Sequence, residues 1–454
     1  MSAIWARGRR AWGWHWLMAG LAFTLSLPAW GASLQDLYAR AQHADATLAA
    51  ARYALEAAGE KPAQARAGLL PSVGLTGSVG YASNRTTFSG FPTSQRDIKT
   101  TNWAVQLTQP VFDRKTWANS DQADALLEQA RAQYAQAQQE LILRLCQAYF
   151  DVIGAQEGIV AAQAQVDAVD QLRAQAGANY AAGISSITDV YEARARLELA
   201  RAQRIAAQNE LEVRRIALEV IVGPLENDAL QAAIFEDAPL PLPTESDAAR
   251  WVEEAVQHSP AVRAQVAAVH AAEVDLNKAS ADHSPTLALV ATYGNNDASG
   301  STTLTADIGQ RNRVAQVALQ LSVPLYSGGG MAAREREFAA LLRKAQAELD
   351  RARHQARAQA RESWTGVRQG VAQVQALDAA VQTSGLLVRS NRKGQQVGLR
   401  ITVDVLDAEL QLYRARRDRV QARHDVLLAA LKLKAAAGVL GDADVQALQR
   451  QVGD

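Results

Sequence analysis

Two pairs of carboxylates are spaced so that they could do chemistry together. Asp404 and Asp407 are three residues apart, and so are Asp189 and Glu192, so each pair lies on one face of a helix. Repeated around a pore, such acids form rings that favour cations and hinder large anions at a narrow mouth. A solvated helix N-terminus also favours acids, by about 0.3–1 kcal/mol each. The spacing alone leaves both interpretations open.

The other reactive residue types do not form a catalytic pattern. Cys146 is the single cysteine and lies in a helical pattern, so we expect a packing role and no disulfide within the chain. The glycine run 328–330 is not followed by Gly-Lys-Ser/Thr, so it predicts a flexible turn and not a phosphate-binding loop. His43 and His258 fall at equivalent points of an internal repeat, which favours a structural role. We expect no enzymatic activity, no metal site and no cofactor.

The composition predicts a mainly helical protein. Of 454 residues, 48% are hydrophobic but only 6% are aromatic, so Ala, Leu and Val supply most of the apolar share. Such side chains favour closely packed helices over a bulky globular core. Lys plus Arg and Asp plus Glu both number 47, which gives no electrostatic reason to expect nucleic acid as a partner.

Residues 1–32 have the pattern of a secretory signal peptide. A basic start precedes a short apolar run at 12–27, and small residues follow. Cleavage after Gly31 and cleavage after Ala32 both stay open. The alternative is a transmembrane anchor, but the apolar run is short and a cleavage-like site follows it at once.

The chain repeats itself at an offset of 214–215 residues, as when 107–112 matches 321–326. We therefore expect two copies of one unit. The expected parts are a first repeat at 33–240, a second repeat at 241–440 joined through the proline-rich stretch 239–243, and a C-terminal tail at 441–454.

Each copy contains two segments in which apolar and polar residues alternate. Val73, Leu75 and Val79 alternate with Ser, Thr and Gly, which is typical of strands with one lipid-facing side. A soluble sandwich is the alternative. The expected strands are 71–83, 101–112, 285–296 and 312–326, with solvent-exposed connections at 84–100 and 295–312.

Four strands are too few to close a transmembrane barrel, which needs about eight or more. An open edge in lipid would leave backbone groups without hydrogen bonds, at a cost of several kcal/mol each. We therefore expect several copies of the chain to pool their strands. The strand number allows two, three or more copies.

One very long helix is expected after the second strand of each copy. Residues 114–180 and 331–396 contain no proline and carry apolar residues at three- and four-residue steps. At 1.5 Å per residue each helix would reach roughly 100 Å, which implies coiled-coil packing. The alternative is a periplasmic coiled-coil scaffold without channel activity. Prolines mark the expected changes between helix and strand, Pro71 and Pro285 on entry and Pro110 and Pro324 on exit.

Together these features resemble the TolC family of outer-membrane efflux and type I secretion proteins. The resemblance covers residues 33–440 and is most specific in two helix–turn–helix tips at about 181–189 and 396–404, with the sequences GISSITDV from Gly183 and VGLRITVDVLDA from Val397. It implies a mainly α fold with a membrane β-barrel: a homotrimer with a twelve-stranded outer-membrane barrel and a periplasmic coiled-coil tunnel of helices. It also implies an exit duct that works with a periplasmic adaptor and an inner-membrane transporter, in contact with outer-membrane lipid.

By this resemblance the tips hold the entrance closed, and Arg400 would pair with Asp189. Gln395 takes the position of a tyrosine in the family's best-known member, so this sequence departs from the aromatic part of the lock. The expected gate residues are Asp189, Glu192, Gln395, Arg400, Asp404 and Asp407, and the expected adaptor-contacting turns contain Gly183, Ser185, Gly398 and Leu399. The sequence leaves the cargo open between polypeptides and small molecules, as well as the identity of the transporter and adaptor.

Overall fold

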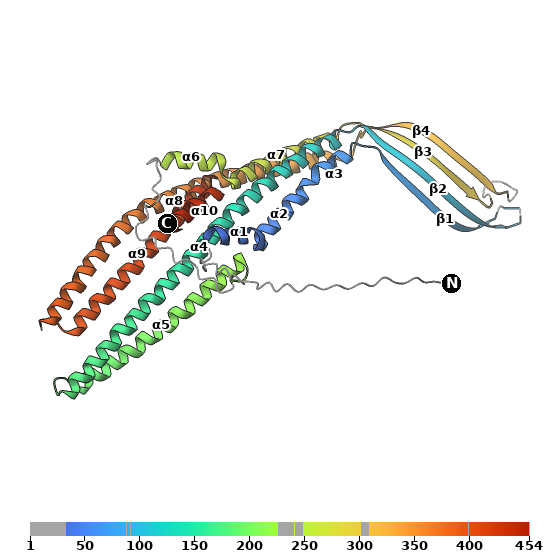
Figure 1. The fold of residues 1–454 in the computed structure, drawn as a ribbon. Helices are drawn as coiled ribbons and strands as arrows, with labels where there is room; N and C mark the ends of the chain where they lie inside the picture. The colour runs from blue at the N-terminus through green and yellow to red at the C-terminus, as the bar shows by residue number, and fades with distance from the viewer. Residues whose placement is uncertain are drawn as a thin grey trace, which may run out of the picture.

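A computed structural model describes residues 33–87, 89–90, 92–225, 240, 248–300, 308–397 and 399–453 of the chain. These residues form a long molecule with a sheet at one end and the tips of two helical hairpins at the other (Figure 1). The expected signal peptide at 1–32 lies outside the described residues, as does the linker 239–243 apart from Leu240.

The same order of elements, short helices, two strands, a long helix and a shorter helix, occurs twice. The first set is α1 Leu34–Ala44, α2 Ala46–Gly59, α3 Lys61–Ala67, β1 Ser72–Thr86, β2 Ser94–Phe112, α4 Arg114–Ala181 and α5 Ile187–Val222. The second is α6 Ala248–His258, α7 Pro260–Ala281, β3 Thr286–Ala298, β4 Gln310–Ser322, α8 Gly330–Gln396 and α9 Thr402–Ala436, followed by α10 Asp442–Gly453.

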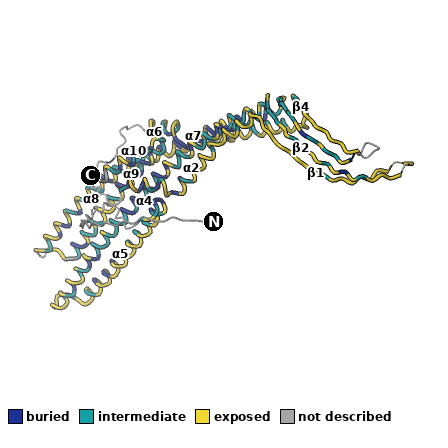
Figure 2. Tube along the Cα trace, turned by 45° about the vertical axis from the view of Figure 1, so that its right-hand side comes forward, coloured by how far each residue is buried: buried dark blue, intermediate teal, exposed yellow. Residues whose placement is uncertain are grey.

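The strands form one antiparallel sheet in the order β1-β2-β3-β4, so β1 and β4 are its edges. The sheet has no helix packed over either face in the view of Figure 1. Large apolar side chains on it are exposed, among them Leu75 at 73% and Val317 at 74%. Figure 2 shows that buried residues gather in the helical body, while the strands and tips are mostly exposed.

The strand boundaries differ from those expected. β2 begins at Ser94 instead of 101 and β1 runs on to Thr86, so most of the connection expected at 84–100 is strand. The polar composition of this segment suggested a loop, but Arg85 and Gln95 pair across the hairpin with a 3.1 Å hydrogen bond. β3 continues to Ala298, and β4 lies at 310–322 instead of 312–326 because Pro324 has no N–H with which to extend the ladder.

The expected C-terminal tail is instead the helix α10. Val445 and Leu448 lie on one of its faces and are buried against α1 in the same core as Leu34 and Leu37. The Tyr38 hydroxyl also donates a 2.6 Å hydrogen bond to the carboxylate of Asp442. These contacts join the two ends of the described chain, which a local pattern could not show.

The largest core lies where α1, α4, α5, α9 and α10 meet. On α4, Arg144 donates two hydrogen bonds of 3.0 Å to Asp45, whose carboxylate also accepts the Leu48 amide and so caps α2. Burial alone would raise the pKa of Asp45, but these hydrogen bonds outweigh it and lower the pKa. The Asp45–Arg144 pair thus fixes the short helices against the long one.

His424 on α9 is fully buried and stacks on Phe150 of α4, with ring centroids 4.7 Å apart. Burial, with a contribution from the charge of Arg423, lowers the pKa of His424 to about 4. The imidazole is therefore neutral at physiological pH and acts as a core side chain at the α4–α9 contact.

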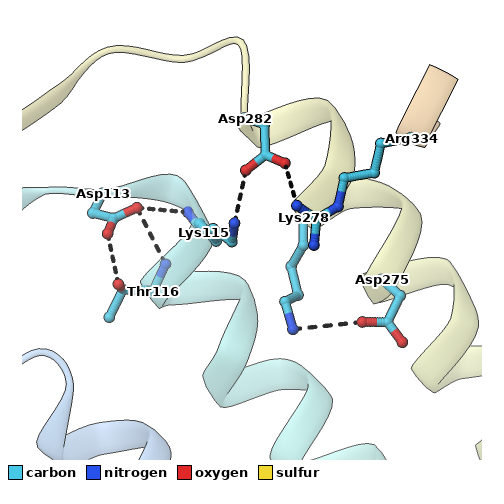
Figure 3. A network of polar contacts seen from close by, with 7 residues as sticks. All are labelled: Asp113, Lys115, Thr116, Asp275, Lys278, Asp282 and Arg334. Carbon is cyan, nitrogen blue, oxygen red and sulfur yellow. Dashed lines mark hydrogen bonds and ion pairs between the residues drawn. The ribbon is translucent and has the colours of Figure 1, made fainter. Parts of the chain in front are cut away.

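Ion pairs join the helices at the base of the sheet (Figure 3). Asp113 caps α4 by accepting the amides of Lys115 and Thr116, and the Lys115 Nζ lies 2.8 Å from the carboxylate of Asp282. The guanidinium of Arg334 on α8 lies 3.5 Å from the same carboxylate. Asp282 thus links the starts of α4 and α8 to the end of α7.

The four prolines expected at helix–strand changes occupy different kinds of position. Pro71 and Pro285 directly precede β1 and β3. Pro324 follows β4, whereas Pro110 lies inside β2 at a register shift with β3, and the strand continues to Phe112. The missing N–H of Pro110 is accommodated by that irregularity and does not end the strand.

No helix in the described part of the chain combines the length and the apolarity that crossing a membrane would require.

Candidate functional site at the hairpin tips

The first tip joins α4 to α5 in a tight turn. Gly183 has a φ of +72°, a conformation that side chains with a Cβ rarely adopt, and its amide donates to the Tyr180 carbonyl at 2.9 Å. Ser186 then caps α5 by accepting the Thr188 amide, while the Asp189 carboxylate accepts the Ser186 amide at 3.3 Å. This capping box fixes the direction in which α5 leaves the turn.

The second tip joins α8 to α9, and its fold depends on a glycine that our sequence analysis missed. The amides of Leu399 and Arg400 both donate to the Gly394 carbonyl, at 2.8 and 3.2 Å. A Cβ on residue 394 would lie 2.8 Å from the Cγ of Arg400, so glycine allows the arginine stem to pack on α8. Sequence reasoning could have found Gly394 from its position, because a glycine in the last turn of a long predicted helix indicates a close approach there. Gly398 lies outside the described residues.

The two tips border a common groove of about 490 Å³. It lies between the ends of α4 and α5 on one side and the α8–α9 turn on the other. Four of the six expected gate residues line it, together with Ser185 of the first turn: Asp189, Glu192, Gln395 and Arg400. The structure therefore brings together residues that are about 200 positions apart in the sequence.

The expected ion pair between Arg400 and Asp189 is replaced by local contacts. The Arg400 guanidinium, in the turn before α9, lies 3.6 Å from the carboxylate of Asp404 in the first turn of α9. Asp189 uses its carboxylate in the capping box of α5. The physical reason is proximity: both groups find a partner within four residues, at less conformational cost than across the groove.

The acids at the tips differ in how far their charge is compensated. The Glu192 carboxylate lies 2.6 Å from the guanidinium of Arg196, one turn along α5, and Asp404 forms an ion pair with Arg400. Asp407 is exposed on α9 and forms none of the ion pairs found among the described residues. The first tip is thus less acidic than its Asp189–Glu192 spacing suggested, and Asp407 contributes most of the uncompensated negative charge of the second.

Side-chain contacts also hold α8 and α9 together behind the tip. The guanidinium of Arg392 donates to the Glu409 carboxylate at 2.6 and 2.9 Å, and the Asn391 amide donates to the Asp404 carbonyl at 2.9 Å. Asn391 is buried, so this hydrogen bond is shielded from water. The helix pair behind the tip is therefore held together by side chains from both helices.

The ends of both tips expose large apolar side chains. Ile184 is 76% exposed in the first turn, and in the second Leu399 is 81% exposed. Val397 and Ile401 flank Leu399 and are exposed as well. Apolar side chains gathered at the end of a helical hairpin are typical of a protein contact surface.

Among the described residues, no group of three or more His, Cys, Asp or Glu side chains could hold a metal ion. What the tips offer is electrostatic and steric: acids, the arginines Arg196 and Arg400, and exposed apolar turns around a groove.

Comparison with known proteins places these features in a family context. Residues 37–224 and 251–439 each match the model of the outer membrane efflux protein family. The two matched segments correspond to the two sets of elements described above.

Individual proteins match over nearly the whole chain. The outer membrane protein TolC of Vibrio cholerae is 30% identical over 426 residues, which cover 93% of this chain and 94% of that protein. The proteases secretion protein PrtF of Dickeya chrysanthemi is 31% identical over 419 residues, or 91% of this chain and 90% of PrtF. Among solved structures, the outer membrane protein VceC of Vibrio cholerae shares the fold with a TM-score of 0.71 at 21% identity, covering 90% of this chain and 99% of VceC.

Proposed function

The chain belongs to the outer membrane efflux protein family, and we propose that three copies of it form the exit duct of a type I protein secretion system. It is an outer-membrane channel protein with a periplasmic helical domain. The proposal concerns the number of copies, the cargo, the gate and the partners.

The open-edged sheet is the main observation that supports assembly from several copies. It has two open edges, β1 and β4, and one of its faces bears exposed Leu75, Val79, Val317 and Leu319. A face of this kind is stable in lipid only if the edges are paired, because unpaired backbone groups cannot hydrogen-bond there. Three copies joined edge to edge supply twelve strands, enough for a closed barrel.

The names of two relatives support polypeptide cargo. PrtF is a proteases secretion protein, and the 30% identical AprF of Pseudomonas aeruginosa is an alkaline protease secretion protein. We therefore assign a secreted polypeptide as the main cargo. Small-molecule efflux is the second candidate, and the efflux description of the family favours it.

The groove at the tips supports a gate. Asp189, Glu192, Gln395 and Arg400 line it, at the end of the helical body farthest from the sheet (Figure 1). In a trimer these charges repeat around the axis, so that small rotations of the hairpins change the width of the entrance. Gln395 makes this gate polar at the position where the sequence departs from a tyrosine.

The exposed apolar turns support the docking of a periplasmic adaptor. Ile184 and Leu399 are the most exposed large apolar side chains described in the two turns, and their burial by a partner would supply apolar contact area. Such docking would bring an inner-membrane transporter to the gate through the adaptor.

The test is deletion of the gene in its host, with complementation by the wild-type gene. We expect the loss of one or a few secreted polypeptides from the medium and their return on complementation. If drug susceptibility rises while secretion is unchanged, the cargo is small molecules. If neither changes, the chain is not an exit duct in that host, and the coiled-coil scaffold becomes the better account.

A further inference from the structure

The apolar face of the sheet changes character toward the β1–β2 and β3–β4 connections. On β4, Leu321, Leu319 and Val317 alternate along one face, and Arg313 and Arg311 continue the same alternation. β3 shows the same change, because the strand register places Asn295 opposite Arg313 and Asp297 opposite Arg311. On β3 and β4 this face thus passes from apolar to charged within a few residues.

Contacts between side chains confirm that these residues share one face. The rings of Trp103 and Tyr293 meet edge to face with centroids 5.9 Å apart. The Arg311 guanidinium lies 2.6 Å from the Asp297 carboxylate, on the same side of the ladder as Tyr293. By the same register Lys99 stands opposite Tyr81 on this side, two alternations beyond Trp103.

The charged residues of the strands are concentrated on this apolar face. It carries four basic and two acidic residues toward the connections: Arg85, Lys99, Arg311 and Arg313, with Asp97 and Asp297. On the opposite face of the described strands, Arg96 is the one charged residue. Most charged residues of the strands therefore lie on the apolar face, where four basic and two acidic residues leave a net charge of +2, against +1 on the opposite face.

The position of these charged residues fits the edge of a membrane. From Leu321 to Arg313 the strand advances eight residues, or about 26 Å at 3.3 Å per residue. A tilt of about 40° reduces this to about 20 Å, close to the roughly 25 Å height of the apolar band of outer-membrane barrels. Tyr81, Trp103 and Tyr293 stand at the boundary, where interfacial aromatic residues are favoured. The charged residues thus lie at headgroup level in the leaflet away from the helices.

Several of the basic groups remain available to an anion. Arg311 is paired with Asp297, and the Asp97 carboxylate accepts a hydrogen bond from the Tyr81 hydroxyl. Arg85, Lys99 and Arg313 form none of the ion pairs found among the described residues, and all three are exposed. Lys99 and Arg311 also border a groove of about 550 Å³ on this part of the sheet.

We propose that this belt, Arg85, Lys99, Arg311 and Arg313, binds the phosphate groups of glycolipids in the outer leaflet of the outer membrane. The ligand must combine an anionic head with an apolar body, because the basic residues continue the lipid-facing band on the same face. Arginine and lysine side chains can extend from such a boundary to phosphates at headgroup level. The proposal rests on the insertion of the sheet into the outer membrane, as assigned above.

The test measures binding of lipid A to the purified full-length protein in detergent. Dephosphorylated lipid A and inorganic phosphate serve as separate probes. The variant carries Arg85→Gln, Lys99→Gln and Arg313→Gln, which leaves the Arg311–Asp297 pair intact. The matched control is Arg96→Gln on the opposite face of β2. We expect wild type to prefer lipid A over its dephosphorylated form at least tenfold, the triple variant to lose that preference and the control to keep it.

Each other outcome contradicts the proposal in a distinguishable way. Equal binding of the two lipid A forms by wild type overturns it without any variant, and so does a triple variant that keeps the preference. Binding of inorganic phosphate as tight as that of lipid A would show a free-anion site and overturn the lipid assignment. Conductance of the same preparations in planar bilayers separates the two claims: channels without a phosphate preference refute only the belt, whereas wild type without channels refutes the exit duct as well.

Discussion

The guanidinium of Arg400 lies 3.6 Å from the carboxylate of Asp404, and the aliphatic stem of Arg400 packs on Gly394. Asp189 borders the same groove with its own carboxylate turned to the cap of α5. Arg400 is therefore the cation that the second tip contributes to the groove, whose other arginine, Arg196, is paired with Glu192 on the first tip. In the proposed gate, Arg400 keeps the α8–α9 tip close to the α4–α5 tip by balancing their negative charge.

Replacing Arg400 tests this role. Arg400→Ser removes the cation that compensates Asp404 at the groove and leaves only Arg196, which is already paired with Glu192. The tips should therefore repel, and the resting conductance in planar bilayers should rise severalfold. Arg400→Lys keeps the charge and should remain near wild type. A serine variant with wild-type conductance would remove Arg400 from the gate.

Gly394→Ala should act on the gate through Arg400. The new Cβ would lie 2.8 Å from the Arg400 Cγ, so the arginine stem must shift. We expect a rise in resting conductance in the same direction as for Arg400→Ser, but smaller. Gly385→Ala is the matched control on the same helix, because a Cβ there meets nothing within 4 Å. Equal behaviour of the two alanine variants would show that the close approach at Gly394 does not matter.

Asp404→Asn with Asp407→Asn should lower cation selectivity, measured as a reversal potential in a salt gradient. The structure also predicts which single variant has the larger effect. Asp407→Asn alone should shift the reversal potential more than Asp404→Asn alone, because Arg400 already compensates the charge of Asp404. An unchanged potential in the double variant rules out an acidic ring, and the reverse order contradicts the assigned pairing.

The buried imidazole of His424 predicts a pH dependence of stability. Burial lowers the pKa of His424 to about 4 from an ordinary value of 6.5. Between these pH values the unfolded chain therefore binds a proton at this histidine, whereas the folded chain does not. The stabilisation is complete above pH 6.5 and is lost as the pH falls toward 4, by about 3 kcal/mol in total. His424→Phe should flatten the pH dependence of thermal unfolding in this window. Comparison at pH 8, where the histidine is neutral, gives the packing effect alone; equal slopes for the two proteins would contradict the assignment.

The sequence predicted the parts of the fold that depend on periodicity. The long helices α4 and α8 follow from three- and four-residue apolar spacing without proline, and the four strands follow from strict alternation. Alternation could not define the length of the β1–β2 hairpin, since beyond Tyr81 the paired residues are polar on both faces apart from Ala82 and Ile98. α10 was missed because its apolar face packs on α1, at the other end of the described chain.

The site was predicted in its location but not in its contacts. The tip sequences indicated the residues that meet in the groove, Asp189, Glu192, Gln395 and Arg400. The pairing of Arg400 came from resemblance alone, and the structure gives the arginine a nearer partner in Asp404. Gly394 was missed because the Arg400 stem occupies the position that a Cβ on residue 394 would take, a contact that residue spacing in the sequence does not reveal.

In the proposed assembly separate copies complete one channel, because the sheet of a single chain has open edges at β1 and β4. Native mass spectrometry of protein extracted from outer membranes in mild detergent tests it directly. We expect a mass three times that of the mature chain; a species with the mass of one chain would show that the subunits do not assemble into a channel.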